Sequence, residues 1–421
     1  MQVLKAVRRR IRLLWRLPQR LSNSLTGSQV VLVSVVILII QNIVYGIFPC
    51  RFNFKRKKFV FSLPLAIYSF AVATLFSAYY GRHLWQAYSE KQLTLRDPVQ
   101  IYSYMFACAA MMNYVTQWAM VPEILRFQNN LDLFETMDYF RLTLGTVAPA
   151  TVLSGLKLFG CPLLLQLTLI IYQKHTHPEL SWLKTIHTMF PIYLGNQLNN
   201  CFFGGIVVTR NVLIEINKRL REIQVEVNRL QTPLEMMLHK HYYRMRRFCD
   251  LADRLDELAS KYTVSTSSSM DYLDLTAFSM VTYMAINLTN TTLGIYTQYQ
   301  AFADFLMLDI SYEISRALAH LVFLVIPMAD IYVLARVCQQ VIDEANETGN
   351  LLQRISLQHS DVRFNQVVDA LWLEVKTIRY QLVPMGLLEL DGALFTMIFS
   401  TVSGFLLFLI QNDLTQRFSL K

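Results

Sequence analysis

Seven long stretches of hydrophobic residues recur along the chain, and charged segments separate them. They cover residues 59–80, 98–122, 142–172, 188–209, 275–303, 317–335 and 392–410. Each approaches or exceeds the roughly 20 residues that an α-helix needs to cross the hydrocarbon core of a bilayer. Within these stretches, only Lys157 in the third and Asp330 in the sixth are charged. The pattern therefore predicts an all-α membrane protein with seven transmembrane helices.

An earlier hydrophobic stretch, residues 30–47, is expected to behave differently. Basic clusters lie on both sides of it, at residues 5–20 and 51–58, and the first 58 residues contain no Asp or Glu. A helix that crossed here would place one basic cluster outside the cell, although Lys and Arg favour the cytoplasmic side. Gln41 and Asn42 also make its second half more polar. We expect this stretch to lie in or dip into the cytoplasmic interface and to return.

The distribution of basic residues orients the seven helices. With the N-terminus in the cytoplasm, 30 of the 39 Lys and Arg residues lie on the cytoplasmic side, in agreement with the positive-inside bias. The C-terminal tail is then extracellular, and the protein is expected in the plasma membrane. The predicted regions are a basic cytoplasmic segment at 1–58, six helices within 59–337 that include a cytoplasmic extension at 210–274, cytoplasmic anchor helices at 338–391, the seventh helix at 392–411 and an extracellular tail at 412–421.

The long cytoplasmic segments are patterned as helices that pack on one another. Their hydrophobic residues recur at spacings of three and four, which is the seam of a helix pair. In the first segment the seam residues are Leu213, Ile216, Leu220, Ile223, Val227 and Leu230, followed by Phe248, Leu251, Leu255 and Leu258. Between them and the fifth helix, the Ser- and Thr-rich residues 263–270 are expected to form a flexible turn.

Composition narrows the class of protein. Of the 421 residues, 53% are hydrophobic and only 16% are charged, and the mean hydropathy is +0.32. These values are too apolar for a soluble protein of two or three domains. The net charge of +9 is unevenly placed and points to membrane orientation rather than to nucleic acid.

The sequence contains no recognisable catalytic or metal-binding motif. Its six cysteines are scattered without metal-ligand spacing or a disulfide framework. The pairs His175–His177 and His239–His241 lack the convergent ligands that a metal site requires. No glycine-rich phosphate loop, nucleophile elbow or HExxH motif occurs. We therefore expect no enzymatic activity, no cofactor and no bound metal.

Polar and aromatic residues gather in the outer halves of the predicted helices. Polar groups cost free energy in hydrocarbon, so they should face the bundle interior or a water-filled cavity. Together they predict a concave, aromatic site for a small molecule, although a hydrogen bond between helices explains any single one equally well. The candidate pocket residues are Tyr104, Gln166, Tyr193, Gln197, Asn287, Asn290, Tyr296, Arg316 and His320.

The last helix combines small residues with a bulky end. Ser403 and Gly404 would let another helix approach closely, whereas residues 405–410 are bulky and apolar and are followed by Gln411 and Asn412. A hydrophobic constriction beside a polar mouth is what a hydrophobic gate requires. An ordinary membrane helix with a polar end would show the same pattern, so both interpretations stay open.

Three segments carry a resemblance to a known family. Residues 46–49 read Gly-Ile-Phe-Pro before a basic stretch. Residues 191–193 read Pro-Ile-Tyr, and the helix continues through Asn211 to Leu220 into the cytoplasm. Residues 388–395 read Leu-Glu-Leu-Asp-Gly-Ala-Leu-Phe at the entry to the last helix. Over most of its length, the chain resembles an insect gustatory receptor.

The end of the last helix matches this family in part. Family members have Thr-Tyr, five hydrophobic residues and Gln-Phe there. The chain instead has Gly404 and Phe405, hydrophobic residues 406–410, then Gln411 and Asn412. The spacer and Gln411 match the family pattern, and the other three residues depart from it. Asn412 in place of Phe implies either a leakier pore or a partner subunit that supplies the better gate.

The resemblance implies a ligand-gated, non-selective cation channel that detects a small-molecule tastant in chemosensory neurons. Because divergent members often have this role, the tastant is expected to be bitter or otherwise aversive. The resemblance also implies a homo- or hetero-tetramer in the lipid bilayer, with a cytoplasmic anchor domain, a central pore lined by the seventh helix and a tastant pocket in the outer half of each subunit's first six helices. The implied pore and gate residues are Leu407, Phe408, Ile410, Gln411 and Asn412.

Two other classes of membrane protein are alternatives. A G-protein-coupled receptor requires an extracellular N-terminus, which the basic first 58 residues oppose, and the sequence has no DRY-like or NPxxY-like stretch at the expected helix ends. A secondary transporter would favour internal repeats and broken helices at the midplane, and no repeat is found in the sequence.

Overall fold

The computed structural model describes residues 27–53, 58–90, 98–130, 133–176, 182–238, 241–308 and 314–419. The basic segment before residue 27 lies outside the described residues, as do His177 and His239.

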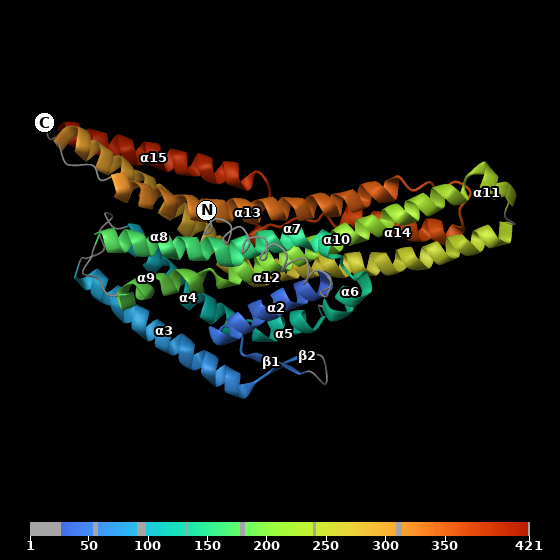
Figure 1. Ribbon diagram of the computed structural model, residues 1–421, viewed down its shortest axis with the longest axis horizontal. Coiled ribbons are helices and arrows are strands. Elements are labelled where there is room, and N and C mark those ends of the chain that lie inside the picture. The colour runs from blue at the N-terminus through green and yellow to red at the C-terminus, as the bar shows by residue number, and fades with distance from the viewer. Residues whose placement is uncertain are drawn as a thin grey trace, which may run out of the picture.

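Almost all of the described chain is helical (Figure 1). The first part comprises α2 (Gly27–Val44), strands β1 (Cys50–Asn53) and β2 (Lys58–Phe61), α3 (Leu63–Ser89), α4 (Pro98–Ala119), α5 (Val121–Asn130), α6 (Leu133–Phe140), α7 (Leu144–Gly155), the π-helix η1 (Leu156–Gly160) and α8 (Cys161–Thr176). The second part comprises α9 (Trp182–Gly195), α10 (Gln197–Leu230), α11 (Pro233–Leu238), α12 (His241–Leu308), α13 (Ile314–Gln353), α14 (Val362–Thr377), the 3-10 turn η2 (Pro384–Gly386) and α15 (Leu394–Ser419).

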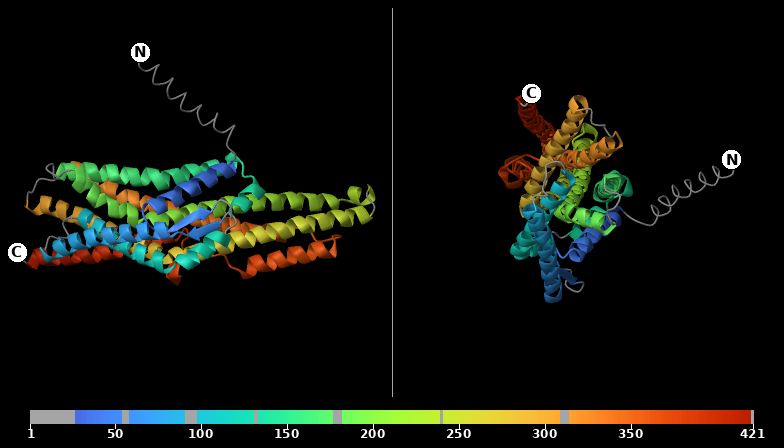
Figure 2. Two further views of the ribbon diagram at one scale, coloured as in Figure 1. Left: turned by 90° about the horizontal axis from the view of Figure 1, so that it is seen from below. Right: turned by 90° about the vertical axis from the view of Figure 1, so that its left-hand side faces the viewer.

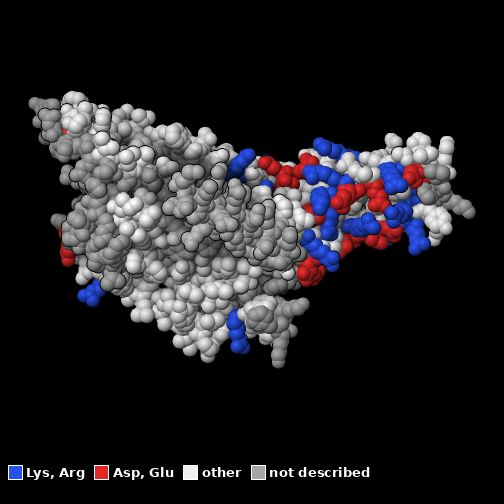
Figure 3. All heavy atoms as spheres, viewed as in Figure 1, with Lys and Arg blue, Asp and Glu red and all other residues white. Residues whose placement is uncertain are grey.

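The molecule is elongated, and most of its long helices run roughly along one axis (Figures 1 and 2). Its charged side chains gather on the narrow end formed by the far parts of α10 and α12 with α11 and α14, which we call the charged lobe (Figure 3). The wider end, which we call the apolar lobe, contains α3, α4, α7 to α9, α15 and the remaining parts of α10, α12 and α13. The C-terminus lies at the end of the apolar lobe, opposite to α11.

Five segments of the described chain are long and apolar enough to cross a membrane: Gly27–Val44, Leu63–Ser89, Leu144–Thr168, Leu324–Gln353 and Leu394–Phe418. The predicted spans 98–122, 188–209 and 275–303 are not among them. The first of these lies on α4, the second is split between α9 and α10, and the third is one part of the much longer α12. The count of seven membrane crossings therefore stays a prediction.

The charged lobe is held together by the predicted hydrophobic seam. The seam residues of α10 from Leu213 to Val227 and those of α12 from Phe248 to Leu258 are buried, and α10 packs against both α12 and α13. A buried polar contact reinforces the packing, because the Thr348 hydroxyl of α13 donates to Oδ1 of Asn217 on α10 at 2.7 Å.

The flexible turn expected at residues 263–270 is wrong, because α12 runs without a break from His241 to Leu308. The hydroxyl groups do not interrupt the helix, because they donate hydrogen bonds to its own carbonyl groups. The Thr263 hydroxyl donates to the Ala259 carbonyl at 3.0 Å, and the Thr266 hydroxyl donates to the Tyr262 carbonyl at 2.9 Å. Such bonds to a carbonyl one turn back are open to Ser and Thr in a helix. The Thr263 hydroxyl also donates to the Glu374 carboxylate of α14 at 2.7 Å, which holds this part of α12.

The C-terminal end of helix α2 lies beside an inner turn of α3 rather than at either end of α3. Its first turn is fixed beside α7, where the Ser28 hydroxyl donates to the Met137 carbonyl at 2.9 Å and accepts from the Leu142 amide at 2.9 Å. After α2, the Ser69 hydroxyl donates to the Gly46 carbonyl, two turns inside α3. The chain then returns through Pro49, whose carbonyl accepts from the Ser62 amide at 3.2 Å. The hairpin β1–β2 lies on this return path, so predicted span 59–80 begins in a strand.

Two of the predicted spans are interrupted near their middles. The third changes from α-helix to π-helix at η1, which contains Lys157. The fourth breaks at Asn196, between α9 and α10. The break brings α9 very close to α4: a Cβ atom at Gly195 would lie 2.7 Å from the Phe106 ring and 2.9 Å from its carbonyl oxygen.

The last helix continues beyond the predicted boundary at Gln411 to Ser419. Two carboxylates explain the extension. Arg417 pairs with Asp413 one turn earlier at 2.7 Å and with Asp304 of α12 at 2.8 Å. The end of α15 is thus fastened to the end of α12.

Two valines of α10, one inside the hydrophobic seam and one outside it, test the packing of the charged lobe. Val227 is fully buried and Val225 is 68% exposed. We expect Val227→Ala to lower the free energy of unfolding by about 2 kcal/mol, because two buried carbon atoms lose their contacts and leave a cavity. Val225→Ala should change it by less than about 0.5 kcal/mol. Unfolding of the purified protein in detergent measures both, and equal effects would contradict the packing described here.

Candidate functional site

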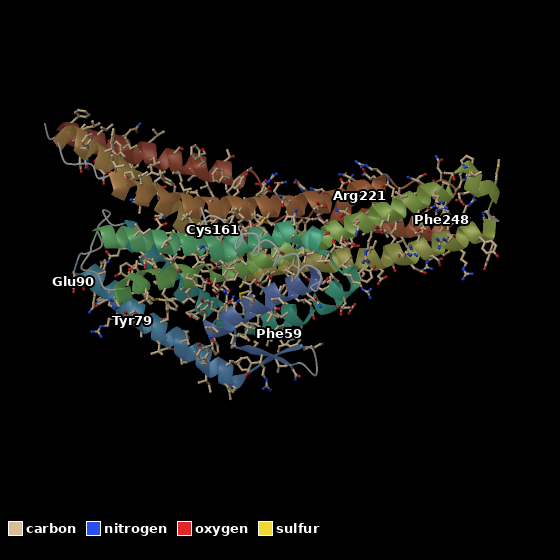
Figure 4. The ribbon with its side chains drawn as sticks, viewed as in Figure 1. Phe59, Tyr79, Glu90, Cys161, Arg221 and Phe248 are labelled. Atoms are coloured by element: carbon tan, nitrogen blue, oxygen red, sulfur yellow. The ribbon has the colours of Figure 1, made fainter. Side chains whose placement is uncertain are left out.

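A cavity lies inside the apolar lobe where six helices converge. Its empty space of about 550 Å³ includes open solvent, so it is a partly open pocket and only a small part of that space is enclosed. Cys161 on α8, labelled in Figure 4, marks its position about halfway along the lobe. Residues from α4, α8, α9, α10, α12 and α13 line it: Tyr102, Phe106, Cys161, Pro162, Leu165, Gln166, Met189, Ile192, Tyr193, Asn196, Asn200, Tyr283, Ile326, Pro327 and Asp330.

Aromatic rings form much of the lining. Tyr102 and Phe106 come from successive turns of α4 and pack edge to face with ring centroids 4.8 Å apart. Tyr283 of α12 lies 6.3 Å from Phe106, and Tyr193 comes from α9. Rings with a polar tip suit a site that must contact apolar surface and also form hydrogen bonds.

A buried ion pair lies at one edge of the cavity. Nζ of Lys157 is 2.6 Å from Oδ1 of Asp330, and the two side chains are 1% and 8% exposed. The second carboxylate oxygen accepts a hydrogen bond from the Tyr283 hydroxyl. Asp330 lines the cavity, whereas Lys157 lies behind it, with Nζ 5.1 Å from the centre of the Phe203 ring.

Each residue of this ion pair lies at or near an irregular turn of its helix. Lys157 lies in the π-helix η1, and such wide turns inside α-helices are frequent at functional sites. Pro327 interrupts the hydrogen-bond ladder of α13 one turn before Asp330. The pair joins residues that are 173 positions apart, so it connects the third and sixth predicted spans.

Asn200 provides an unpaired acceptor in the cavity. Its residue is 3% exposed, and its Oδ1 atom has no hydrogen-bond partner among the described residues. A buried polar atom without a partner costs roughly 1–3 kcal/mol. Asn200 is also one of the residues that line the cavity.

The structure brings together only part of the predicted pocket. Gln166 and Tyr193 line the cavity. Asn287 lies behind the lining, where its Oδ1 accepts from the Tyr102 hydroxyl at 3.0 Å. Gln197 is buried on α10 and donates to Cys201 Sγ at 3.8 Å.

The other predicted pocket residues lie elsewhere. Asn290 is buried on α12 without a side-chain partner among the described residues. Tyr296 accepts from Gln300 at 3.1 Å, and His320 Nδ1 is 2.8 Å from Gln298 Nε2. Tyr104 is not among the lining residues of the cavity, and the side chain of Arg316 lies outside the described part of the structure. Their role in a pocket stays a prediction.

The sequence-based candidates for the pocket did not include three of the residues that give the cavity its chemistry: Lys157, Tyr283 and Asp330. A signal for two of them was present, because a charged residue inside a membrane span is a functional-site candidate whose partner should be sought. Lys157 and Asp330 are the only charges within the seven predicted spans, and their opposite signs make them natural partners.

The predicted gate residues lie in the C-terminal half of α15. Leu407 and Phe408 are 61% and 67% exposed in the single chain. Gln411 and Asn412 are exposed, and Ile410 is half-buried. In the described residues α15 packs mainly against α12 and α13, and its other faces are not covered by this chain.

The cysteines are unsuited to nucleophilic chemistry. All six are free. Burial raises the pKa of the Cys50 thiol to about 12, so the reactive thiolate is scarce at neutral pH. The described residues contain no group of three or more His, Cys, Asp or Glu side chains that could hold a metal ion.

Residues 36–416 match the family model described as 7tm Chemosensory receptor. A Drosophila melanogaster protein named as gustatory receptor 97a is 44% identical over 425 residues and covers 100% of both chains. The Drosophila melanogaster gustatory receptor for bitter taste 93a is 22% identical over 56% of this chain and 52% of its own length. The olfactory receptor OR5 of the insect Machilis hrabei, solved in complex with eugenol, has a TM-score of 0.55 at 12% identity, covering 90% of this chain and 97% of its own.

Removal of one or both charges of the ion pair tests its contribution to stability. Removing one partner leaves a buried charge, so Lys157→Met and Asp330→Asn should each lower the free energy of unfolding by about 3–5 kcal/mol. The double variant removes both charges and should recover most of that loss. Thermal unfolding in detergent of all four proteins measures the coupling, and additive losses in the double variant would show that the two residues act independently.

Proposed function

The chain belongs to the insect gustatory receptor family of 7tm chemosensory receptors, and from this premise we propose that it is a subunit of a tastant-gated, non-selective cation channel. As a member it is a multi-pass membrane receptor rather than an enzyme. The observation that carries the proposal is the cavity between six helices, which combines aromatic walls with an unpaired Asn200 oxygen and a few other polar side chains.

We propose that a bitter or otherwise aversive small molecule occupies this cavity in chemosensory neurons. The relative named for bitter taste supports this choice. The solved olfactory receptor, whose structure contains eugenol, supports a small organic ligand in this fold.

The proposed channel is a homo- or hetero-tetramer around α15. A single chain leaves bulky residues of α15 exposed, among them Phe399, Leu407 and Phe408. Four such helices around an axis would cover these residues and form a hydrophobic constriction. Gln411 and Asn412 would then lie at its outer mouth.

The proposed orientation places the charged lobe in the cytoplasm and the C-terminal end of α15 outside the cell, in the plasma membrane. The charged side chains of α10, α11, α12 and α14 support this side for the lobe (Figure 3). For α2 we propose a re-entrant path, because it starts beside α7 and stops near Ser69, from where the chain returns to Ser62.

Gating in this proposal runs through α12 and α13. A ligand can open the pore only if it binds the open state more tightly than the closed state. Tyr283 and Asp330 of the cavity lie on α12 and α13, and these two helices pack against α15. The Arg417–Asp304 pair fastens the end of α15 to α12. A shift of either helix around a ligand would therefore move the helix proposed to line the pore.

Excised-patch recording tests the proposed function. Cells that express the chain, alone and with candidate partner subunits, are screened with bitter compounds, and an agonist is then applied to excised patches without nucleotide. We expect an agonist-evoked cation current, as a channel requires no second messenger. A response in intact cells that disappears in patches would favour a G-protein-coupled receptor, and substrate flux without conductance would favour a transporter.

Substitution of Asn200 tests whether the ligand binds in the cavity, and substitution of Asn211 is the matched control. Asn211 lies on the same helix, is 1% exposed and also has an unpaired side chain among the described residues, but it does not line the cavity. Asn200→Ala should weaken the agonist by roughly tenfold, about the value of one hydrogen bond, without lowering the unfolding temperature. Asn211→Ala should leave the dose–response curve unchanged. Equal responses in the two variants would place the ligand elsewhere.

Asn412 makes a test of the gate. If the polar Asn412 side chain weakens a hydrophobic seal, Asn412→Phe should lower the basal conductance, because a bulky apolar ring excludes water more completely. Resting currents normalised to surface expression measure this effect. An unchanged or larger resting current would remove Asn412 from the gate.

A further inference from the structure

We propose that the Lys157–Asp330 ion pair determines which ligands the cavity accepts: it selects uncharged aromatic molecules with a hydrogen-bond donor and excludes organic cations. This inference rests on the proposed ligand role of the cavity. It adds a chemical class of ligand and assigns the selection to a residue, Lys157, that lies behind the lining.

The cavity has the composition of a site for organic cations. Tyr102, Phe106 and Tyr283 form one aromatic wall, and the Asp330 carboxylate lies beside Tyr283. Aromatic faces attract cations through their quadrupoles, and cages of such rings recognise ammonium groups. With a free carboxylate next to these rings, a protonated amine would be the expected ligand.

Lys157 removes that preference. Its ammonium group occupies Oδ1 of Asp330 at 2.6 Å, and the Tyr283 hydroxyl occupies Oδ2. Asp330 is the only charged residue among the described residues that line the cavity, so the pair leaves the site with no net charge. An organic cation would add a buried positive charge with no counter-charge of its own, and the loss of its hydration would not be repaid. An organic anion would meet a carboxylate and would lose its hydration in the same way.

Among the lining side chains, that of Asn200 has a buried acceptor, Oδ1, without a partner in the described residues. The residue is only 3% exposed. A hydroxyl or amide N–H group can satisfy this oxygen without bringing a charge. The aromatic wall accepts an aromatic body. The matching class of ligand is therefore an aromatic alcohol, phenol or amide.

A charge series of one molecular shape tests the selection in the wild-type protein. The probes are 2-phenylethanol, the 2-phenylethylammonium ion and the phenylacetate ion, and the measurement is the shift of the unfolding temperature with probe concentration, because a ligand stabilises the state that binds it. We expect the alcohol to bind roughly tenfold or more tightly than either ion, in keeping with the cost of an unpaired buried charge. Equal or tighter binding of the ammonium ion would overturn the proposal.

Two single variants should reverse the selection. Lys157→Met leaves Asp330 without its cation, so 2-phenylethylammonium should stabilise this variant more than 2-phenylethanol does. Asp330→Asn leaves the Lys157 ammonium, so phenylacetate should be the best of the three probes. The double variant has neither charge and should again favour the alcohol.

The single variants are expected to unfold at a lower temperature than the wild type. The ion whose charge replaces the missing side-chain charge should raise this temperature again, and the oppositely charged ion should not. If neither variant is restored by its matching ion, the pair only joins two helices, and the proposal is overturned. The assay measures binding without conduction. A loss of channel current with an intact charge series would therefore contradict the proposed function and leave this inference standing.

Discussion

The hydrocarbon interior of a membrane offers no solvent to an ionised side chain, so Lys157 and Asp330 must neutralise each other within the protein. Their contact ties the third predicted span to the sixth, and Tyr283 adds the fifth by donating to the same carboxylate. The cavity lies directly against this junction. The arrangement of the apolar lobe therefore depends on one electrostatic contact that low dielectric makes strong and costly to break.

The two lobes solve the burial problem in different surroundings. The charged lobe follows the rules of a water-soluble helical bundle, with an apolar seam inside and ionised side chains outside (Figure 3). The apolar lobe exposes large hydrophobic residues, such as Phe70 and Leu75 of α3, and buries polar ones, such as Asn199 and Asn287. This inversion is the expected result when lipid replaces water as the solvent.

Much of the fold could be predicted because its signals are local. The three- and four-residue spacing of Leu213 to Val227 specifies a buried helix face without any knowledge of the partner helix, and hydropathy locates the long helices. Local reasoning was wrong at 263–270, where Ser and Thr suggested a turn but their hydroxyls bond within α12. The site was harder to predict, because a cavity is made by residues distant in sequence. Gln166 and Tyr193 were anticipated, whereas the pairing of Lys157 with Asp330 depends on packing between helices 173 residues apart.

Helix α12 is one continuous rod of 68 residues, which corresponds to about 100 Å at 1.5 Å per residue. It carries seam residue Leu255 in the charged lobe, Tyr283 at the cavity and Asp304 at the far end. A rod without a hinge pivots as a lever, so its two ends move in opposite directions about any fixed point between them. Whatever clamps the arm of this lever in the charged lobe therefore also limits how far a shift at the cavity can tilt the arm in the apolar lobe. In the proposed channel, the response to a ligand would be set as much by this distant packing as by the ligand itself.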